Sequence, residues 1–127
     1  MKRHTKITLQ EIMKRKEQML EAKKGKKTAE IYIESLDGTI IIQEPSRSLC
    51  KDAIDMPDGE GDTYLIYECV VEPNLKSQEL QEAFGCVEPM EIVEKIFEAG
   101  EIPKVSTECL RLAGFSNEVK RIEQLKN

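Results

Sequence analysis

The chain has 127 residues and a mass of 14.5 kDa, enough for one domain with one core. Charged residues make up 34% of it and apolar residues 39%, which is typical of a globular protein with a polar surface, and the net charge is −5. No apolar run approaches the ~18 residues of a membrane-spanning helix, and no signal peptide follows the basic start. We therefore expect neither a membrane protein nor a secreted one.

Charge is divided unevenly along the chain. Residues 1–27 hold ten Lys or Arg against three Glu, which gives +7, whereas residues 28–127 hold nine against twenty-one, which gives −12. Three interpretations stay open: a solvated basic helix on an acidic body, a helix that docks on the acidic body of a neighbouring copy, and an arm that contacts nucleic acid. Docking would use Lys14, Arg15 and Lys16 for self-association.

The basic arm, residues 1–27, is predicted to contain one helix. Thr8 is the expected N-cap, with Glu11 three residues later as in a capping box, and the helix should run to about Lys24 before Gly25. Its apolar stripe is thin and is interrupted by a lysine; it consists of Ile12, Met13, Lys16 and Leu20. We therefore expect the arm to be only partly held by the core.

Residues 28–44 are predicted to form a β-hairpin. Asp37-Gly38 suits a two-residue type I′ turn, which would place Ile33 opposite Ile42. One face of the hairpin would then carry four isoleucines, Ile31, Ile33, Ile40 and Ile42. Because two strands alone are marginal in water, helices must cover this face or another copy must extend the sheet.

Residues 46–127 are predicted to form a body of short helices. The expected segments, bounded by capping residues, Gly and Pro, are 46–54, 62–71, 77–84, 90–99 and 103–113, with a last helix from Asn117 that carries Val119, Ile122 and Leu125. In the first of these we expect Leu49, Cys50, Ala53 and Ile54 to face inward. The predicted fold class is α+β: a mainly helical single domain, residues 1–127, with one hairpin packed on several short helices.

No constellation of residues indicates catalysis, a cofactor or a metal. The single histidine, His4, lies in the basic tail, and the four cysteines have no close pair, so we expect buried, reduced thiols. The acidic loop with Asp58, Glu60 and Asp62 lacks the Gly and the final Glu that an EF-hand calcium loop needs. We expect no enzyme activity and no metal or cofactor site.

Two stretches carry a family resemblance, YLIYECVVEPNLK at 64–76 and ELQEAFGCVEPMEIVEKIFEAGEI at 79–102. They resemble the tail assembly chaperones of tailed phages and prophages, in particular the XkdN-like family of PBSX-type prophages. The Lys-rich first helix, the hairpin at 31–43, the Pro-Ser-Arg-Ser at 45–48, the segment LRLAGFS at 110–116 and the tail at 120–127 also fit. The resemblance spans nearly the whole chain and rests on length and order.

The resemblance implies a non-enzymatic chaperone in the cytoplasm of the bacterial host, absent from the finished virion. It would bind the tape measure protein and help to recruit tail tube subunits, and we also expect a homo-oligomer. The alternative is a small nucleic-acid-associated regulator that uses the basic arm. Exposed apolar side chains of the later helices would contact the client, unless they pack in the core: Leu75, Leu80, Phe84, Val87, Met90 and Phe97.

Overall fold

A computed structural model describes residues 5–122 of the chain. It is mainly helical, with seven α-helices and one three-stranded antiparallel sheet in these residues, which confirms the α+β class. The elements in chain order are α1 (Leu9–Lys14), α2 (Lys16–Lys24), β1 (Thr28–Ile33), η1 (Glu34–Leu36), β2 (Gly38–Gln43), α3 (Arg47–Asp55), α4 (Glu60–Cys69), β3 (Val70–Glu72), α5 (Gln78–Ala83), α6 (Glu91–Ile96) and α7 (Glu101–Leu112). No helix within residues 5–122 is both long and apolar enough to span a membrane.

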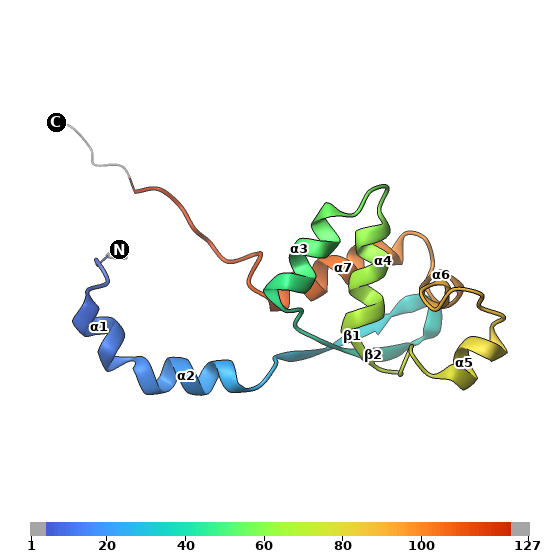
Figure 1. Cartoon of the computed structure of the whole chain (residues 1–127), viewed down its shortest axis with the longest axis horizontal. Coiled ribbons are helices and arrows are strands. Elements are labelled where there is room, and N and C mark those ends of the chain that lie inside the picture. The colour runs from blue at the N-terminus through green and yellow to red at the C-terminus, as the bar shows by residue number, and fades with distance from the viewer. Residues whose placement is uncertain (1–4, 123–127) are drawn as a thin grey trace.

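The basic arm extends away from the rest of the structure (Figure 1). Thr8 caps it as expected, since its hydroxyl accepts a hydrogen bond of 3.2 Å from the backbone N–H of Glu11. The prediction of one continuous helix is wrong, because Arg15 lies in a turn at φ −88° and ψ 0° that separates α1 from α2. Neither helix buries a residue, so no packing contact stabilises α1 and α2 as one continuous helix.

The hairpin is present, but its predicted register is wrong. Residues 34–36 form a 3₁₀ turn and Asp37 takes the left-handed conformation at φ 45°, so the loop has four residues rather than two. Ile33 therefore pairs with Gly38, and Ile42 with Ala29. The register differs by an even number of residues, which keeps every side chain on its predicted face. Ile33, Ile40 and Ile42 are buried accordingly.

A third strand, β3, extends the sheet next to β2. Val70 pairs with Ile42, and Glu72 pairs with Ile41, in the order β1-β2-β3. The predicted helix through Val71 therefore ends two residues early, at Cys69. Two consecutive β-branched valines, Val70 and Val71, favour the extended backbone.

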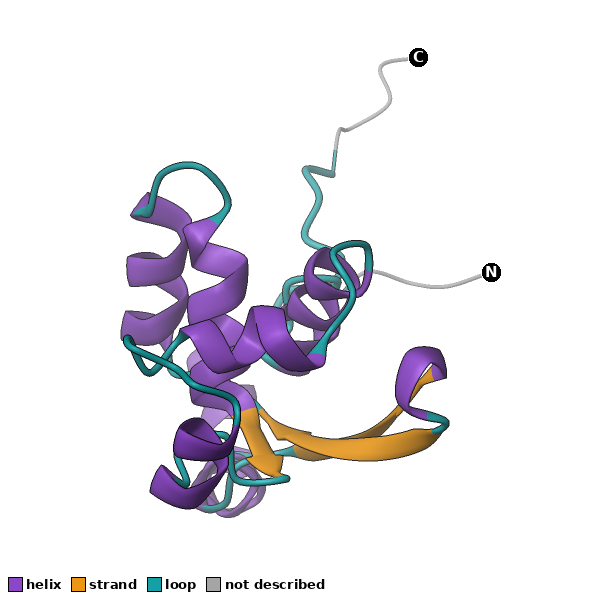
Figure 2. Ribbon diagram, turned by 90° about the vertical axis from the view of Figure 1, so that its right-hand side faces the viewer, coloured by secondary structure: helices purple, strands orange, loops and turns teal. Residues whose placement is uncertain are grey.

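Helices cover the isoleucine face of the sheet, as the hairpin requires (Figure 2). α7 contacts β1 and β2, and α4 lies between α3, α7 and β3. Close approach of α3 to α4 depends on Gly61, which faces the backbone of Ala53. The fully buried core side chains come from both layers: Ile42, Ile66, Leu75, Ile92, Val93 and Cys109.

Several predicted helix boundaries are confirmed and others are corrected. Ser46 and Ser77 cap α3 and α5, accepting hydrogen bonds of 3.1 Å and 3.2 Å from backbone N–H groups. Asp62 lies in the first turn of α4 instead of capping it, because Gly59 provides the cap at φ 76°. Residues 117–122 form no helix, and Leu125 lies outside the described residues.

Candidate partner-binding surfaces

The structure divides the six expected client residues into three groups. Leu75 and Phe97 are 0% and 4% exposed, so the expectation that they lie on the surface is wrong. Both pack in the hydrophobic core. Leu80 and Met90 are half-buried. Only Phe84 and Val87 are well exposed, at 44% and 86%.

Phe84 and Val87 form what we call the apolar corner, between α5 and α6. Gly85 turns the chain at this corner with φ 65°, a conformation that side chains disfavour. The backbone N–H of Val87 donates a hydrogen bond of 2.8 Å to Glu91 Oε2, which ties the corner to the first turn of α6. Phe84 and Val87 are therefore exposed to solvent, and the hydrogen bond to Glu91 fixes the backbone at Val87.

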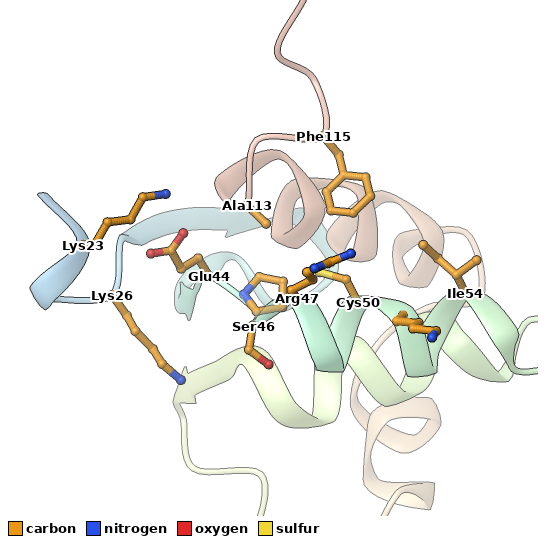
Figure 3. A pocket seen from close by; sticks show the side chains of 11 residues that line it. Lys23, Lys26, Glu44, Ser46, Arg47, Cys50, Ile54, Ala113 and Phe115 are labelled. Atoms are coloured by element: carbon orange, nitrogen blue, oxygen red, sulfur yellow. The ribbon is translucent and has the colours of Figure 1, made fainter. Parts of the chain in front are cut away.

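A second surface, the basic groove, lies between the end of the arm, α3 and the segment after α7. Figure 3 shows Arg47, Cys50 and Ile54 on the side of α3 that faces Phe115. The groove has a volume of about 690 Å³ and combines four cations, Lys23, Lys26, Arg47 and Lys51, with one carboxylate, Glu44. Sequence analysis missed this surface.

Two apolar side chains of the basic groove are left exposed, Ile54 at 64% and Phe115 at 57%. The expectation that Ile54 faces inward is wrong, because α3 turns only Cys50 and Ala53 fully into the core. Phe115 follows Gly114, which ends α7 at φ 92° and redirects the chain along the groove. A phenylalanine directly after a helix-ending glycine is the sequence signal that could have indicated this side of the basic groove.

A third surface, the acidic groove, lies between α4 and the start of α6. Its volume is about 610 Å³, and no Lys or Arg is among the described residues that line it. Four carboxylates surround it: Glu60, Glu88, Glu91 and Glu94. Its apolar lining includes three half-buried side chains, Met56, Tyr67 and Met90.

The expected self-association residues lie at the junction of α1 and α2, and all three are exposed. Arg15 pairs with Glu11 across one helical turn, at 3.4 Å between Nε and Oε2. Within residues 5–122 no carboxylate lies in ion-pair distance of Lys14 or Lys16. These two ammonium groups are therefore available to an acidic partner.

Within the described part of the chain, a serine and three cysteines have their polar groups buried. Ser106 is 1% exposed and donates a hydrogen bond of 2.7 Å to Asp62 in the first turn of α4. Cys109 donates to the sulfur of Cys69, and this hydrogen bond together with burial raises the pKa of the Cys109 thiol well above its usual range. Among the described residues no group of three or more His, Cys, Asp or Glu could hold a metal ion.

Comparisons with known proteins identify the family. Residues 47–126 of the 127-residue chain match the phage XkdN-like tail assembly chaperone family. The matched region contains α3 to α7, the apolar corner, the acidic groove and part of the basic groove. Comparison with curated proteins and with solved structures gave no match. The family match covers more than half of the chain, and the chain therefore belongs to the XkdN-like family of phage tail assembly chaperones.

Proposed function

We propose that this protein is a non-enzymatic chaperone that binds the tape measure protein and helps to recruit tail tube subunits during phage tail assembly. It would act in the host cytoplasm and be absent from the finished virion. The observation that carries the proposal is the exposure of four large apolar side chains on the apolar corner and the basic groove, all within the family-matched region: Ile54, Phe84, Val87 and Phe115. Exposed apolar groups of this kind favour a protein partner.

These four side chains lie at two surfaces rather than in one deep cleft. The apolar corner presents Phe84 and Val87 and the basic groove presents Ile54 and Phe115. Two shallow surfaces give modest affinity for each copy, but many copies along one long client give strong total binding. Weak individual contacts would also let an incoming tube subunit displace one copy at a time.

The apolar corner is the better candidate for the first client contact. Val87 is 86% exposed although its backbone is fixed by the hydrogen bond to Glu91, so a partner can bury it with little loss of backbone entropy. Leu80 is half-buried in α5, before the corner, and would extend the apolar contact. The basic groove adds cations, which would suit an acidic stretch of the client.

Co-expression with the tape measure protein from the same phage, followed by a pull-down, tests the proposal. We expect wild type to be retained, and F84D/V87D to lose most of the binding because two aspartates replace the exposed apolar contact. I54D/F115D tests the basic groove in the same way. L36D is the matched control, since Leu36 is 45% exposed but lies in the hairpin loop, outside the matched region.

The outcomes separate the two surfaces. Loss of binding in one double variant and not in L36D would assign the client contact to that surface. If wild type does not retain the tape measure protein, or if neither double variant differs from L36D, the proposed contacts are wrong. Thermal melting of each variant checks that the fold is intact.

A further inference from the structure

We propose that the basic arm of one copy docks in the acidic groove of another, so that copies join head to tail. The proposal goes beyond client binding and does not depend on it. It starts from two surfaces of opposite charge that both lack a partner within residues 5–122. One is the arm, and the other is the groove between α4 and α6.

The arm carries an apolar stripe that no residue between 5 and 122 of its own chain covers. Leu9, Ile12 and Met13 share one face of α1, at spacings of three and four residues, and are 79%, 41% and 60% exposed. Leu20 in α2 is 57% exposed. An isolated arm of this length gains little from helix propensity alone, so a partner that buries the stripe would stabilise it.

The acidic groove has the complementary character. Met56, Tyr67 and Met90 provide apolar contact area, while the surrounding carboxylates attract Lys and Arg. Within residues 5–122 no cation lies in ion-pair distance of Glu60, Glu88 or Glu94. An amphipathic helix with an apolar stripe flanked by lysines therefore matches both parts of this surface.

The geometry favours docking between copies over docking within one chain. α1 and α2 extend from one side of the body, whereas α6, which forms one wall of the groove, lies on the other side in Figure 1. Arm and groove are different surfaces, so the contact is heterologous and each copy can bind one neighbour and accept another. Such a contact builds a ring or an open row of copies, the arrangement that a long rod-shaped client would need.

Two charge-reversal variants test the contact. K14E/K16E reverses two exposed cations of the arm and leaves Arg15 with its partner Glu11. E88K/E94K reverses two exposed carboxylates of the groove and leaves Glu91, whose carboxylate holds the backbone of Val87. The matched controls, K104E/R121E and E79K/E98K, change net charge equally at exposed positions outside the contact and outside the basic groove.

Sedimentation velocity of the full chain gives the readout. Wild type should sediment as a species larger than a monomer that becomes smaller as salt rises, because attraction between charges is screened over about 8 Å at physiological ionic strength. Each contact variant alone should sediment as a monomer, and each control as wild type. An equal mixture of the two contact variants should regain the larger species, since reversed arms match reversed grooves and native arms match native grooves.

The opposite results overturn the proposal. The proposal is wrong if wild type stays monomeric at low salt. It is also wrong if the contact variants assemble like wild type, or if their mixture stays monomeric. Loss of DNA binding by K14E/K16E with assembly unchanged would assign the arm to nucleic acid instead. Far-UV circular dichroism checks the fold, and K14Q/K16Q with E88Q/E94Q replaces any variant that does not fold.

Discussion

Glu101 holds the loop of the hairpin against the start of α7 through Ser35. Its Oε1 accepts a hydrogen bond of 2.7 Å from the Ser35 hydroxyl, and its Oε2 accepts one of 3.2 Å from the Ser35 backbone N–H. The backbone N–H of Glu98 also donates to Oε1, at 2.8 Å. The Glu98 N–H, followed by the Ser35 hydroxyl, stabilises the charged form and lowers the pKa of the Glu101 carboxyl.

The lowered pKa of Glu101 predicts a specific dependence of stability on pH. Because the folded-state pKa lies below the unfolded-state value, Glu101 contributes its full stability above the unfolded-state pKa and loses it as pH falls through the folded-state pKa. Replacing it in E101Q removes this contribution. The melting temperature of E101Q should therefore lie below that of wild type at neutral pH and approach it in acid.

Melting curves recorded across the acidic range check this prediction. E34Q is the matched control, because Glu34 is an exposed glutamate of the same loop whose side chain has no hydrogen bond with another described residue. Its melting temperature should follow that of wild type throughout. A gap between E101Q and wild type that stays constant down to strong acid would contradict the role given to the carboxylate.

Gly61 is predicted to tolerate no side chain. A Cβ at this position would overlap the carbonyl oxygen of Ala53 and lie 2.9 Å from its carbonyl carbon, so α3 and α4 would have to move apart. We expect G61A to lower the free energy of unfolding by roughly 3 kcal/mol, the upper end for overpacking. G100A is the control, since its Cβ meets nothing within 4 Å and its φ of −75° suits alanine.

Urea denaturation measures both glycine variants. G100A should change the free energy of unfolding by less than ~1 kcal/mol, in the stabilising direction. Equal stability of G61A and G100A would show that the close contact of α3 and α4 is not required.

The buried hydrogen bond from Ser106 to Asp62 should contribute measurably to stability. S106A removes the donor and leaves the partly buried carboxylate of Asp62 without it, at a cost of about 2 kcal/mol for a hydrogen bond to a charged group. T107A is the control, since Thr107 is exposed and its hydroxyl donates only to the Pro103 carbonyl of its own helix. A urea titration that gives the same midpoint for both variants would contradict this prediction.

The sequence predicted those features that depend on neighbouring residues. The caps at Thr8, Ser46 and Ser77 need only a side-chain oxygen three residues before an N–H, and all three are present. The hairpin register depended on the loop, and the 3₁₀ turn before Asp37 gives no local signal that separates it from a two-residue turn. The valines of the short strand β3 favour extended backbone, but its pairing with β2 depends on a segment almost thirty residues earlier, which no local pattern shows.

The candidate surfaces were only partly predictable for the same reason. Leu75 precedes α5 and Phe97 follows α6, where apolar side chains can be exposed, but both pack in the core because the path of the chain turns them inward. Ile54 was expected to face inward from its helix but is exposed. Periodicity places a residue on a helix face, whereas burial of that face depends on which distant segment covers it.

The four free cysteines should differ in their reactivity. Cys86 is half-buried, whereas Cys50, Cys69 and Cys109 are 3%, 1% and 0% exposed. Burial raises the pKa of Cys50, and the hydrogen bond to Cys69 together with burial raises that of Cys109. Under native conditions we expect only Cys86 to react rapidly with an aromatic disulfide reagent, and all four to react in urea.

The absorbance of the released thiolate measures this reactivity, and C86S is the matched control, with no rapid phase. Two or more rapid equivalents in wild type would contradict the burial of the other three thiols.

The last prediction concerns the arm as a part of the fold. α1 and α2 bury no residue, so deleting residues 1–24 should change the free energy of unfolding by less than about 1 kcal/mol. L65A provides the contrast, because Leu65 is 2% exposed in the core and its truncation should cost roughly 2–5 kcal/mol. Urea denaturation at high salt, where wild type should be monomeric and assembly adds nothing to its stability, compares the three proteins. A deletion as damaging as L65A would show that the arm belongs to the core of a single copy, and the +7 charge of residues 1–27 would then act within the chain.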